Sequence, residues 1–161
     1  MPIGKPLKLR DIDEKDKKII MLLQEDGRMQ LNKISKKVGL SIDSVHKRIK
    51  EMLKKRIFET GIFIEPRALG YPLIADIKIK LKNVSKEERG KFILYLQKHK
   101  RCIELLSILG DFDFTCVLIA KDSNDLDEIS TEIRQKFKDL ILEWKGLLIL
   151  KQYKFERYDL L

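Results

Sequence analysis

The sequence has few of the residues that build disulfide frameworks, flexible linkers or membrane spans. Its 161 residues include two cysteines, four prolines and eight glycines, which excludes a disulfide-rich secreted scaffold and a low-complexity chain. No apolar run approaches the about 20 residues that span a bilayer, and residues 1–10 lack the apolar stretch of a signal peptide. Two cysteines without an export signal predict a reducing cytoplasm.

Signatures of catalysis and of cofactor binding are also scarce. The chain has no Cys-x-x-Cys for zinc and no glycine-rich phosphate loop, and its two histidines are far apart. Asp111 and Asp113 on one turn are a weak metal-ligand set. Cys102 and Cys116 fall on strands that we expect to be neighbours, either as buried structural thiols or as a redox pair. We therefore predict no catalytic residue, no metal and no cofactor.

Acidic residues are scarce in one part of the chain. Lys and Arg total 34 against 25 Asp and Glu, a net charge of +9. Between Arg28 and Arg56 there are ten basic residues and two acidic ones. The positive electrostatic field of this segment attracts a polyanion, and such binding depends strongly on salt concentration. The alternative is a solvated lysine-rich surface of no special function.

Three amphipathic helices are predicted within the first 58 residues. The first starts at Asp11 or Asp13, either of which can cap it, and ends near Asp26-Gly27. The second is short and stops at Gly39. The third starts at Ser41, after a turn of at most four residues.

The third helix has one apolar side and one basic side. At 100° per residue, Lys47, Lys50 and Lys54 point away from the apolar stripe. That stripe comprises Ile42, Val45, Ile49, Met52 and Leu53. A short helix, a tight turn and a helix with a basic outer face are typical of a helix-turn-helix (HTH), whose second helix enters the major groove. Any three-helix bundle with a solvated third helix would give the same pattern.

The pattern assigns candidate contacts to double-stranded DNA. Candidates on or next to the third helix are Ser41, Ser44, His46, Lys47, Arg48 and Lys50, with Arg48 and Lys47 as the strongest base readers. Candidate phosphate contacts are Lys36, Lys37, Lys54 and Lys55, with a wing near Thr60.

The segment after this helix is β-prone and leads into a linker. Residues 57–64 fit a small wing followed by a strand, with Gly61 between two short runs. We therefore divide the chain into a winged HTH domain at 1–60, a linker strand at 61–72 and a second domain at 73–161.

The second domain is predicted to have the order βαββαβ. Leu73–Leu81 alternates as a half-buried strand, and Ser85 to Glu88 has the form of a capping box. The remaining predicted elements are strands at Cys102–Leu109, Phe114–Ala120 and Leu147–Leu150, an edge strand at Tyr153–Tyr158, a tight turn at Gly110-Asp111 and a helix capped by Ser123 or Asn124. This is an α+β, ferredoxin-like plan with helices on one sheet face. Pairing of two such sheets in a symmetric homodimer would cover the other face.

Several segments resemble the Lrp/AsnC (feast/famine) family of transcription regulators, in order and over nearly the whole length. The segments are Asp13–Asp16 with Leu22–Arg28, Val38–Ser41 with Val45–Met52, Arg67–Tyr71, and Gly110–Phe114, which is similar to the family's Gly-x-x-Asp signature. Arg56, Leu109, Trp144 and Gly146 differ from the family pattern, the last three near its ligand pocket.

The resemblance implies a DNA-binding transcription regulator made of a winged HTH and a ferredoxin-like effector domain. It implies homodimers that assemble further, commonly to octamers, and an amino-acid effector near the Gly-x-x-Asp turn, here Gly110, Asp111, Phe112 and Asp113. The differences at the ligand pocket favour another effector or none. An architectural protein that coats DNA with little sequence preference, and a sensory module without DNA binding, are the alternatives.

Overall fold

The computed structural model describes residues 12–161, which divide into two units. One unit combines the N-terminal helices with the last eight residues, 154–161, and the other spans Ile64–Tyr153. The predicted second domain ran to residue 161, so the structure moves the chain's end to the first unit. Asp11, one of the two predicted caps, lies outside the described residues.

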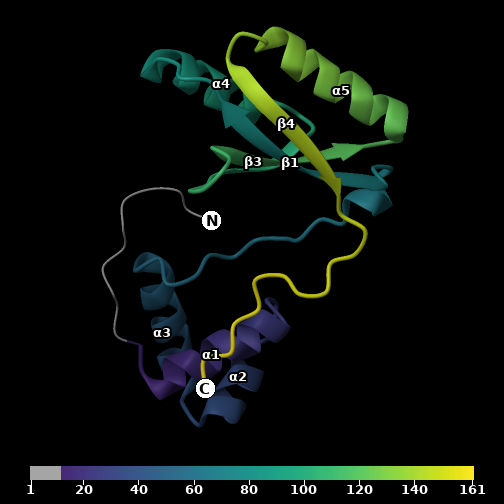
Figure 1. The fold of residues 1–161 in the computed structure, drawn as a ribbon. Coiled ribbons are helices and arrows are strands. Elements are labelled where there is room, and N and C mark those ends of the chain that lie inside the picture. The colour runs from purple at the N-terminus through teal and green to yellow at the C-terminus, as the bar shows by residue number, and fades with distance from the viewer. Residues whose placement is uncertain (1–11) are drawn as a thin grey trace. The chain divides into compact units, whose positions relative to one another are not determined.

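Three helices form the first unit: α1 (Glu14–Glu25), α2 (Leu31–Val38) and α3 (Ile42–Lys54) (Figure 1). Asp13 caps α1 in a reciprocal capping box with Asp16, and Gly39 ends α2 with a φ of 67°. Ser41 caps α3 as predicted. The core of the unit contains Ile19, Ile20, Ile34, Val38, Val45 and Met52, which are all buried.

Two details of these helices differ from prediction. Gly27 is not among the glycines with positive φ, and α1 ends instead on Asp26 in an extended conformation. Ile42 and Leu53, both assigned to the apolar stripe of α3, are 48% and 37% exposed. Each sits at an end of α3, where the neighbouring helices no longer cover it.

The predicted wing is absent. Residues 57–65 contain no strand, although Ile57 and Phe58 pack against the helical core. Farther along, Ile62 and Phe63 are 85% and 84% exposed. A β-prone segment forms a strand only when it has a partner strand to pair with, and this segment pairs with none within the described chain. Arg56 precedes it with φ 54°, the left-handed region that favours glycine.

The last residues of the chain pack on the three helices. The Gln24 side chain donates to the Tyr158 carbonyl oxygen at 2.9 Å, and its own amide oxygen accepts from the Tyr158 backbone N–H at 2.9 Å. Leu160 packs against the helical core. Residues 153–158 form no edge strand, and Tyr158 among them is hydrogen-bonded to Gln24 of α1.

The second unit contains an antiparallel sheet in the order β2-β3-β1-β4. Its strands are β1 (Leu73–Leu81), β2 (Cys102–Ser107), β3 (Phe114–Ala120) and β4 (Ile141–Leu148). The short 3-10 helix η1 (Pro66–Leu69) precedes β1 within the predicted linker. β4 starts six residues before the predicted fourth strand, and residues 108–113 form a longer connection than a tight turn.

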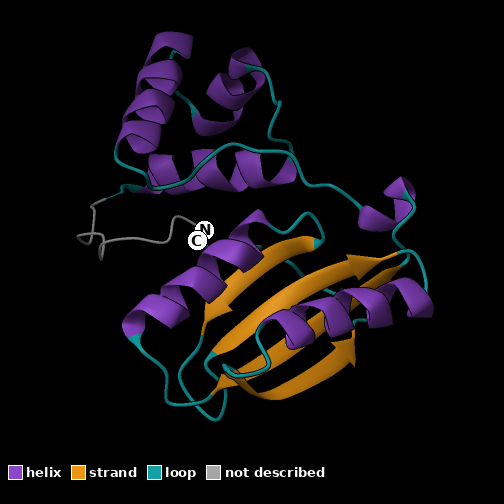
Figure 2. Ribbon diagram, turned by 90° about the horizontal axis from the view of Figure 1, so that it is seen from above, coloured by secondary structure: helices purple, strands orange, loops and turns teal. Residues whose placement is uncertain are grey.

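Helices α4 (Lys86–Lys98) and α5 (Ser123–Lys136) lie on the same face of this sheet (Figure 2). Phe92, Leu96 and Ile133 of the helices are buried against Ile77, Cys116 and Leu118 of the strands. Ser85 and Glu88 form the predicted capping box of α4. The cap of α5 is Asp122, one residue before the predicted candidates, because its carboxylate accepts from the Asp125 N–H. The ferredoxin-like plan is confirmed.

Candidate nucleic-acid interface and effector loop

The turn between α2 and α3 is fixed by contacts of its own backbone. The Ser35 hydroxyl donates to the Leu40 carbonyl at 2.7 Å, and the Leu40 N–H donates to the Ser35 carbonyl at 3.2 Å. The Lys15 ammonium from α1 donates to the Val38 carbonyl, one of the carbonyls left free at the end of α2. These contacts set the angle at which α3 leaves the turn.

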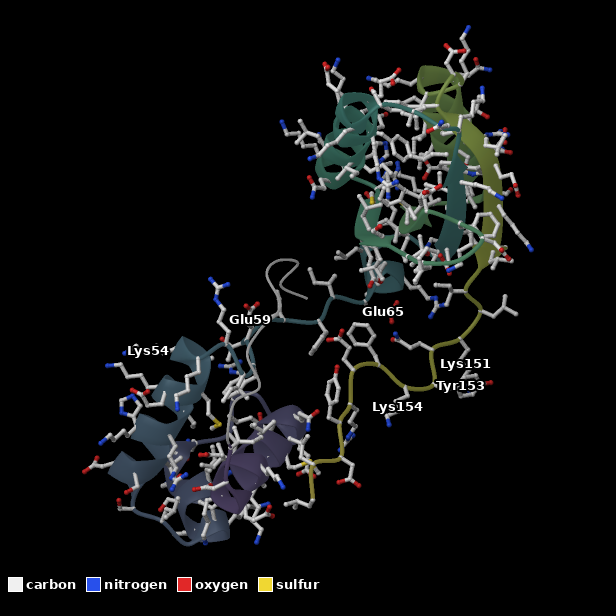
Figure 3. The ribbon with its side chains drawn as sticks, turned by 60° about the vertical axis from the view of Figure 1, so that its left-hand side comes forward. Lys54, Glu59, Glu65, Lys151, Tyr153 and Lys154 are labelled. Carbon is white, nitrogen blue, oxygen red and sulfur yellow. The ribbon has the colours of Figure 1, made fainter. Side chains whose placement is uncertain are left out.

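The packing of α3 separates a buried side from a basic side. Val45 and Met52 are buried, and Ile49 is half-buried. On the other side the predicted contacts His46, Lys47, Lys50, Lys54 and Lys55 are all exposed. Figure 3 shows Lys54 on the outer side of α3, near its C-terminal end. By helical spacing, Lys47, Lys50 and Lys54 form one row opposite the buried side.

The N-terminal end of α3 presents hydroxyl groups. The Ser41 hydroxyl accepts from the Ser44 N–H at 3.2 Å and donates to the Ser44 hydroxyl at 2.8 Å. Ser41 is exposed and Ser44 is half-buried. Lys36 and Lys37 lie in the last turn of α2, just before the turn, and both are exposed. Two exposed lysines therefore lie just before the turn that leads into α3.

Arg48 has a different environment from the lysines. Its Nη1 lies 2.7 Å from Asp13 Oδ2 and 2.8 Å from Asp16 Oδ1. Hydrogen bonds to Asp16 and then Asp13 raise the pKa of Arg48, while the Asp16 backbone N–H and the Arg48 guanidinium lower the pKa of Asp13. The guanidinium thus joins α3 to the start of α1.

The sequence pattern does not predict this contact. Asp13 and Asp16 belong to a capping box, a pattern visible in the sequence, but their common partner lies 35 and 32 residues away. Only the packing of α1 against α3 brings the three side chains together.

The loop that contains the predicted effector residues is tied to the sheet by Asp113. Its carboxylate accepts from the Leu81 N–H at 2.8 Å and lies 3.3 Å from the Arg89 guanidinium of α4. Its backbone N–H donates to the Ile79 carbonyl at 2.9 Å. Gly110 has a φ of 146°, which side chains rarely adopt. Gly110 and Asp111 are exposed and Phe112 is half-buried, so the free polar groups of the loop lie in its first half.

Other kinds of site are not found among the described residues. No group of three or more His, Cys, Asp or Glu in residues 12–161 could hold a metal ion. None of the helices in this part of the chain is long and apolar enough to cross a membrane.

The chain is similar to known proteins over both units. The AsnC-type helix-turn-helix domain matches residues 12–53. The HTH-type transcriptional regulator FL11 of Pyrococcus horikoshii is 33% identical over 151 residues, which cover 89% of this chain and 92% of that protein.

Solved structures of regulators share the fold. A transcriptional regulator of Neisseria meningitidis, NMB0573, solved in complex with L-Met, has a TM-score of 0.81 at 21% identity, covering 90% of this chain and 94% of that one. E. coli AsnC has a TM-score of 0.80 at 21% identity, covering 92% and 99%.

These similarities agree with the predicted class of protein, a DNA-binding transcription regulator. Relatives that match most of the chain are named transcriptional regulators, so the protein is a DNA-binding regulator of transcription and not an enzyme. The chain belongs to the Lrp/AsnC family of HTH-type transcriptional regulators.

Proposed function

We propose that this regulator reads promoter DNA with the exposed face of α3. The observation that carries the proposal is the row formed by Lys47, Lys50 and Lys54, exposed on the side of α3 opposite the buried Val45 and Met52. A major groove accepts one such helix. His46 and the Ser41 and Ser44 hydroxyls lie toward the start of α3, the end that meets base edges in most HTH proteins.

Phosphate contacts come from lysines at both ends of the HTH. Lys36 and Lys37 lie at the end of α2, and Lys54 and Lys55 lie at the end of α3. Charges placed on both sides of a recognition helix fix its register on the duplex without reading sequence. Each such contact releases counterions, so binding weakens steeply as salt rises.

Arg48 takes a positioning role in this proposal. Two carboxylates hold its guanidinium at 2.7 and 2.8 Å, so direct readout of a base would require both ion pairs to open. The guanidinium instead sets the angle between α3 and α1. The sequence alone favoured Arg48 as a base reader, and the observed contacts favour Lys47 and Lys50 for that role.

The protein acts as a homodimer joined through the open face of its sheet. α4 and α5 occupy the other face (Figure 2). By register, Ile74, Val117 and Leu147 point away from those helices, and Leu147 is 46% exposed. A second copy is the simplest cover for such a face. Further assembly to an octamer is the extension that the family resemblance implies.

A small ligand binds at the loop of Gly110 to Asp113, and an amino acid is the first candidate to test, although Leu109, Trp144 and Gly146 differ from the family's ligand pocket. The NMB0573 regulator, which shares the fold, was solved with L-Met. In this chain Asp113 is committed to Leu81 and Arg89, so backbone groups of Gly110 to Phe112 are left for the ligand. Ligand binding would change DNA binding only by unequal affinity for two assembly states.

The experiment selects bound fragments from random DNA at near-physiological salt. The size of the protein–DNA complex is measured at the same time. We expect an enriched palindrome bound by an even number of chains. No enrichment, with long stretches of DNA covered, would favour the architectural alternative. Lys37→Ala should weaken all fragments alike and reduce the salt slope by about one unit, whereas Lys86→Ala on α4 is the matched control without effect.

A thermal-shift screen against the twenty amino acids tests the effector. We expect one or a few amino acids to raise the melting temperature, and Gly110→Val to abolish that rise. Silence across the screen would overturn the amino-acid effector while leaving the DNA-binding proposal intact.

A further inference from the structure

The two cysteines of the chain lie against each other in the second unit. Cys102 begins the edge strand β2 and Cys116 lies in the neighbouring β3. Their sulfur atoms are 3.3 Å apart, although the residues are not directly opposite, since Cys102 pairs with Leu118 and Leu105 pairs with Cys116. The two side chains lie diagonally across the ladder, beside a register shift between Cys102 and Glu104.

The two thiols differ in access. Cys116 is fully buried in the core, whereas Cys102 is partly exposed at the sheet edge. A hydrogen bond from the Cys116 thiol lowers the pKa of Cys102. The same hydrogen bond and burial raise the pKa of Cys116. The accessible sulfur is therefore the one that more readily becomes a thiolate, the reactive form of cysteine.

We propose that Cys102 and Cys116 are a redox-active pair that forms a reversible disulfide within one chain. The Cys102 thiolate attacks a peroxide, which breaks the O–O bond, leaves a sulfenic acid on Cys102 and releases water or an alcohol. The Cys116 sulfur then attacks the Cys102 sulfur, its proton leaves with the hydroxyl group as water, and the S–S bond forms. A small thiol reverses the reaction by exchange and is itself oxidised to a disulfide.

The geometry favours this chemistry over two inert thiols. Closing the gap to a bond of about 2.05 Å moves the sulfurs by little more than 1 Å, and the bulged edge strand can absorb that shift. The residue that attacks is accessible, and the residue that resolves is already in contact with it. The bond would link β2 to β3. These two strands are joined by residues 108–113, the connection that contains the proposed effector loop.

The test is oxidation of the full, reduced chain with hydrogen peroxide, followed by alkylation of the remaining thiols and mass spectrometry. We expect the loss of two hydrogen atoms per chain and no alkylation, with full reversal by dithiothreitol. After denaturation, cleavage next to Glu104 or Asp111 separates the two cysteines of an unoxidised chain. In the oxidised chain the fragments should stay joined until reduced.

Single substitutions assign the two roles. In Cys116→Ala, peroxide should leave a sulfenic acid on Cys102 that dimedone traps. In Cys102→Ala, Cys116 should react with alkylating reagents at least tenfold more slowly than Cys102 does in the other variant. Wild-type chains that keep both thiols free, that trap dimedone instead of forming the bond, or that join only to another chain would each overturn the proposal.

Discussion

At the residue scale, substitution of Arg48 distinguishes a basic side chain that reads DNA from one that stabilises the first unit. We expect Arg48→Met to lower the melting temperature of the first unit, because Asp13 and Asp16 lose their shared partner. Lys47→Met, on the exposed row, should leave the melting temperature unchanged and alter base preference. Thermal melts and repeated selection from random DNA separate the two effects. Unchanged stability with relaxed preference in Arg48→Met would return Arg48 to the reading role.

Tyr95 on α4 provides a pH dependence at the alkaline end. Burial, and then its 2.8 Å hydrogen bond to Glu132, raise the pKa of Tyr95 from 10.0 to about 12. The folded state therefore favours the protonated phenol. This contribution to stability is fully present below pH 10 and is lost as the pH rises toward 12.

We expect denaturant midpoints of the wild type to fall between these two pH values more steeply than those of Tyr95→Phe. Tyr153→Phe is the control, because Tyr153 is 88% exposed and should behave as the wild type. Equal slopes for all three chains would show that the Tyr95 hydroxyl carries no part of the alkaline sensitivity.

At element scale, the start of α5 depends on one carboxylate. Asp122 Oδ1 accepts from the Asp125 N–H at 2.9 Å. We expect Asp122→Ala to destabilise the second unit by about 1 kcal/mol, a common cost of losing such a cap. Ser123→Ala should be close to neutral, since Ser123 is the first residue of the helix and not its cap. Urea titrations of both variants would reveal the reverse order if the hydroxyl were the true cap.

The C-terminal segment is a second element whose role can be measured. Gln24 holds the backbone of Tyr158 through two hydrogen bonds, and Leu160 covers part of the helical core. We expect deletion of residues 154–161 to destabilise the three-helix unit by about 1–2 kcal/mol, and Gln24→Ala to give a smaller loss. Lys154→Ala leaves these contacts intact and serves as the control. A truncated chain with an unchanged melt would show that the segment does not stabilise the helices.

Local patterns predicted the elements that are stabilised locally. The side-chain spacing of α2 and α3, the caps at Ser41 and Ser85 and the alternation of β1 all depend on neighbours within a few residues. Elements that depend on distant partners were mispredicted. Ile62 and Phe63 have strand propensity without a strand to pair with, and the end of the chain packs on the three helices instead of adding to the sheet.

In the candidate site, too, local patterns predict some features, whereas others depend on distant partners. The outward row of Lys47, Lys50 and Lys54 follows from helical periodicity alone. The ion pairs of Arg48 and the anchoring of Asp113 to Leu81 and Arg89 join segments 24 to 35 residues apart. Such contacts depend on how the elements pack, which no local pattern specifies.

At the scale of the whole molecule, the proposed homodimer places the open face of the sheet between two chains. Two neighbouring residues of β4 allow a matched test. Leu147 pairs with Asp76 and points to the open face, whereas Leu148 pairs with Ala75 and points to the helix-covered face. Their exposures are similar, 46% and 55%, so an arginine at either position costs little in an isolated chain.

We expect Leu147→Arg to convert the proposed dimer to a monomer, because a guanidinium group from each chain would be buried between the paired sheets, where the neighbouring Asp76 is already paired with Lys78 at 2.7 Å. Leu148→Arg should stay dimeric, and sedimentation velocity distinguishes the two. A monomer presents a single α3 and loses the second half-site, so its affinity for a palindrome should fall to that for one half-site. If Leu147→Arg stays dimeric and keeps its affinity, the subunits meet elsewhere and the open face serves another contact.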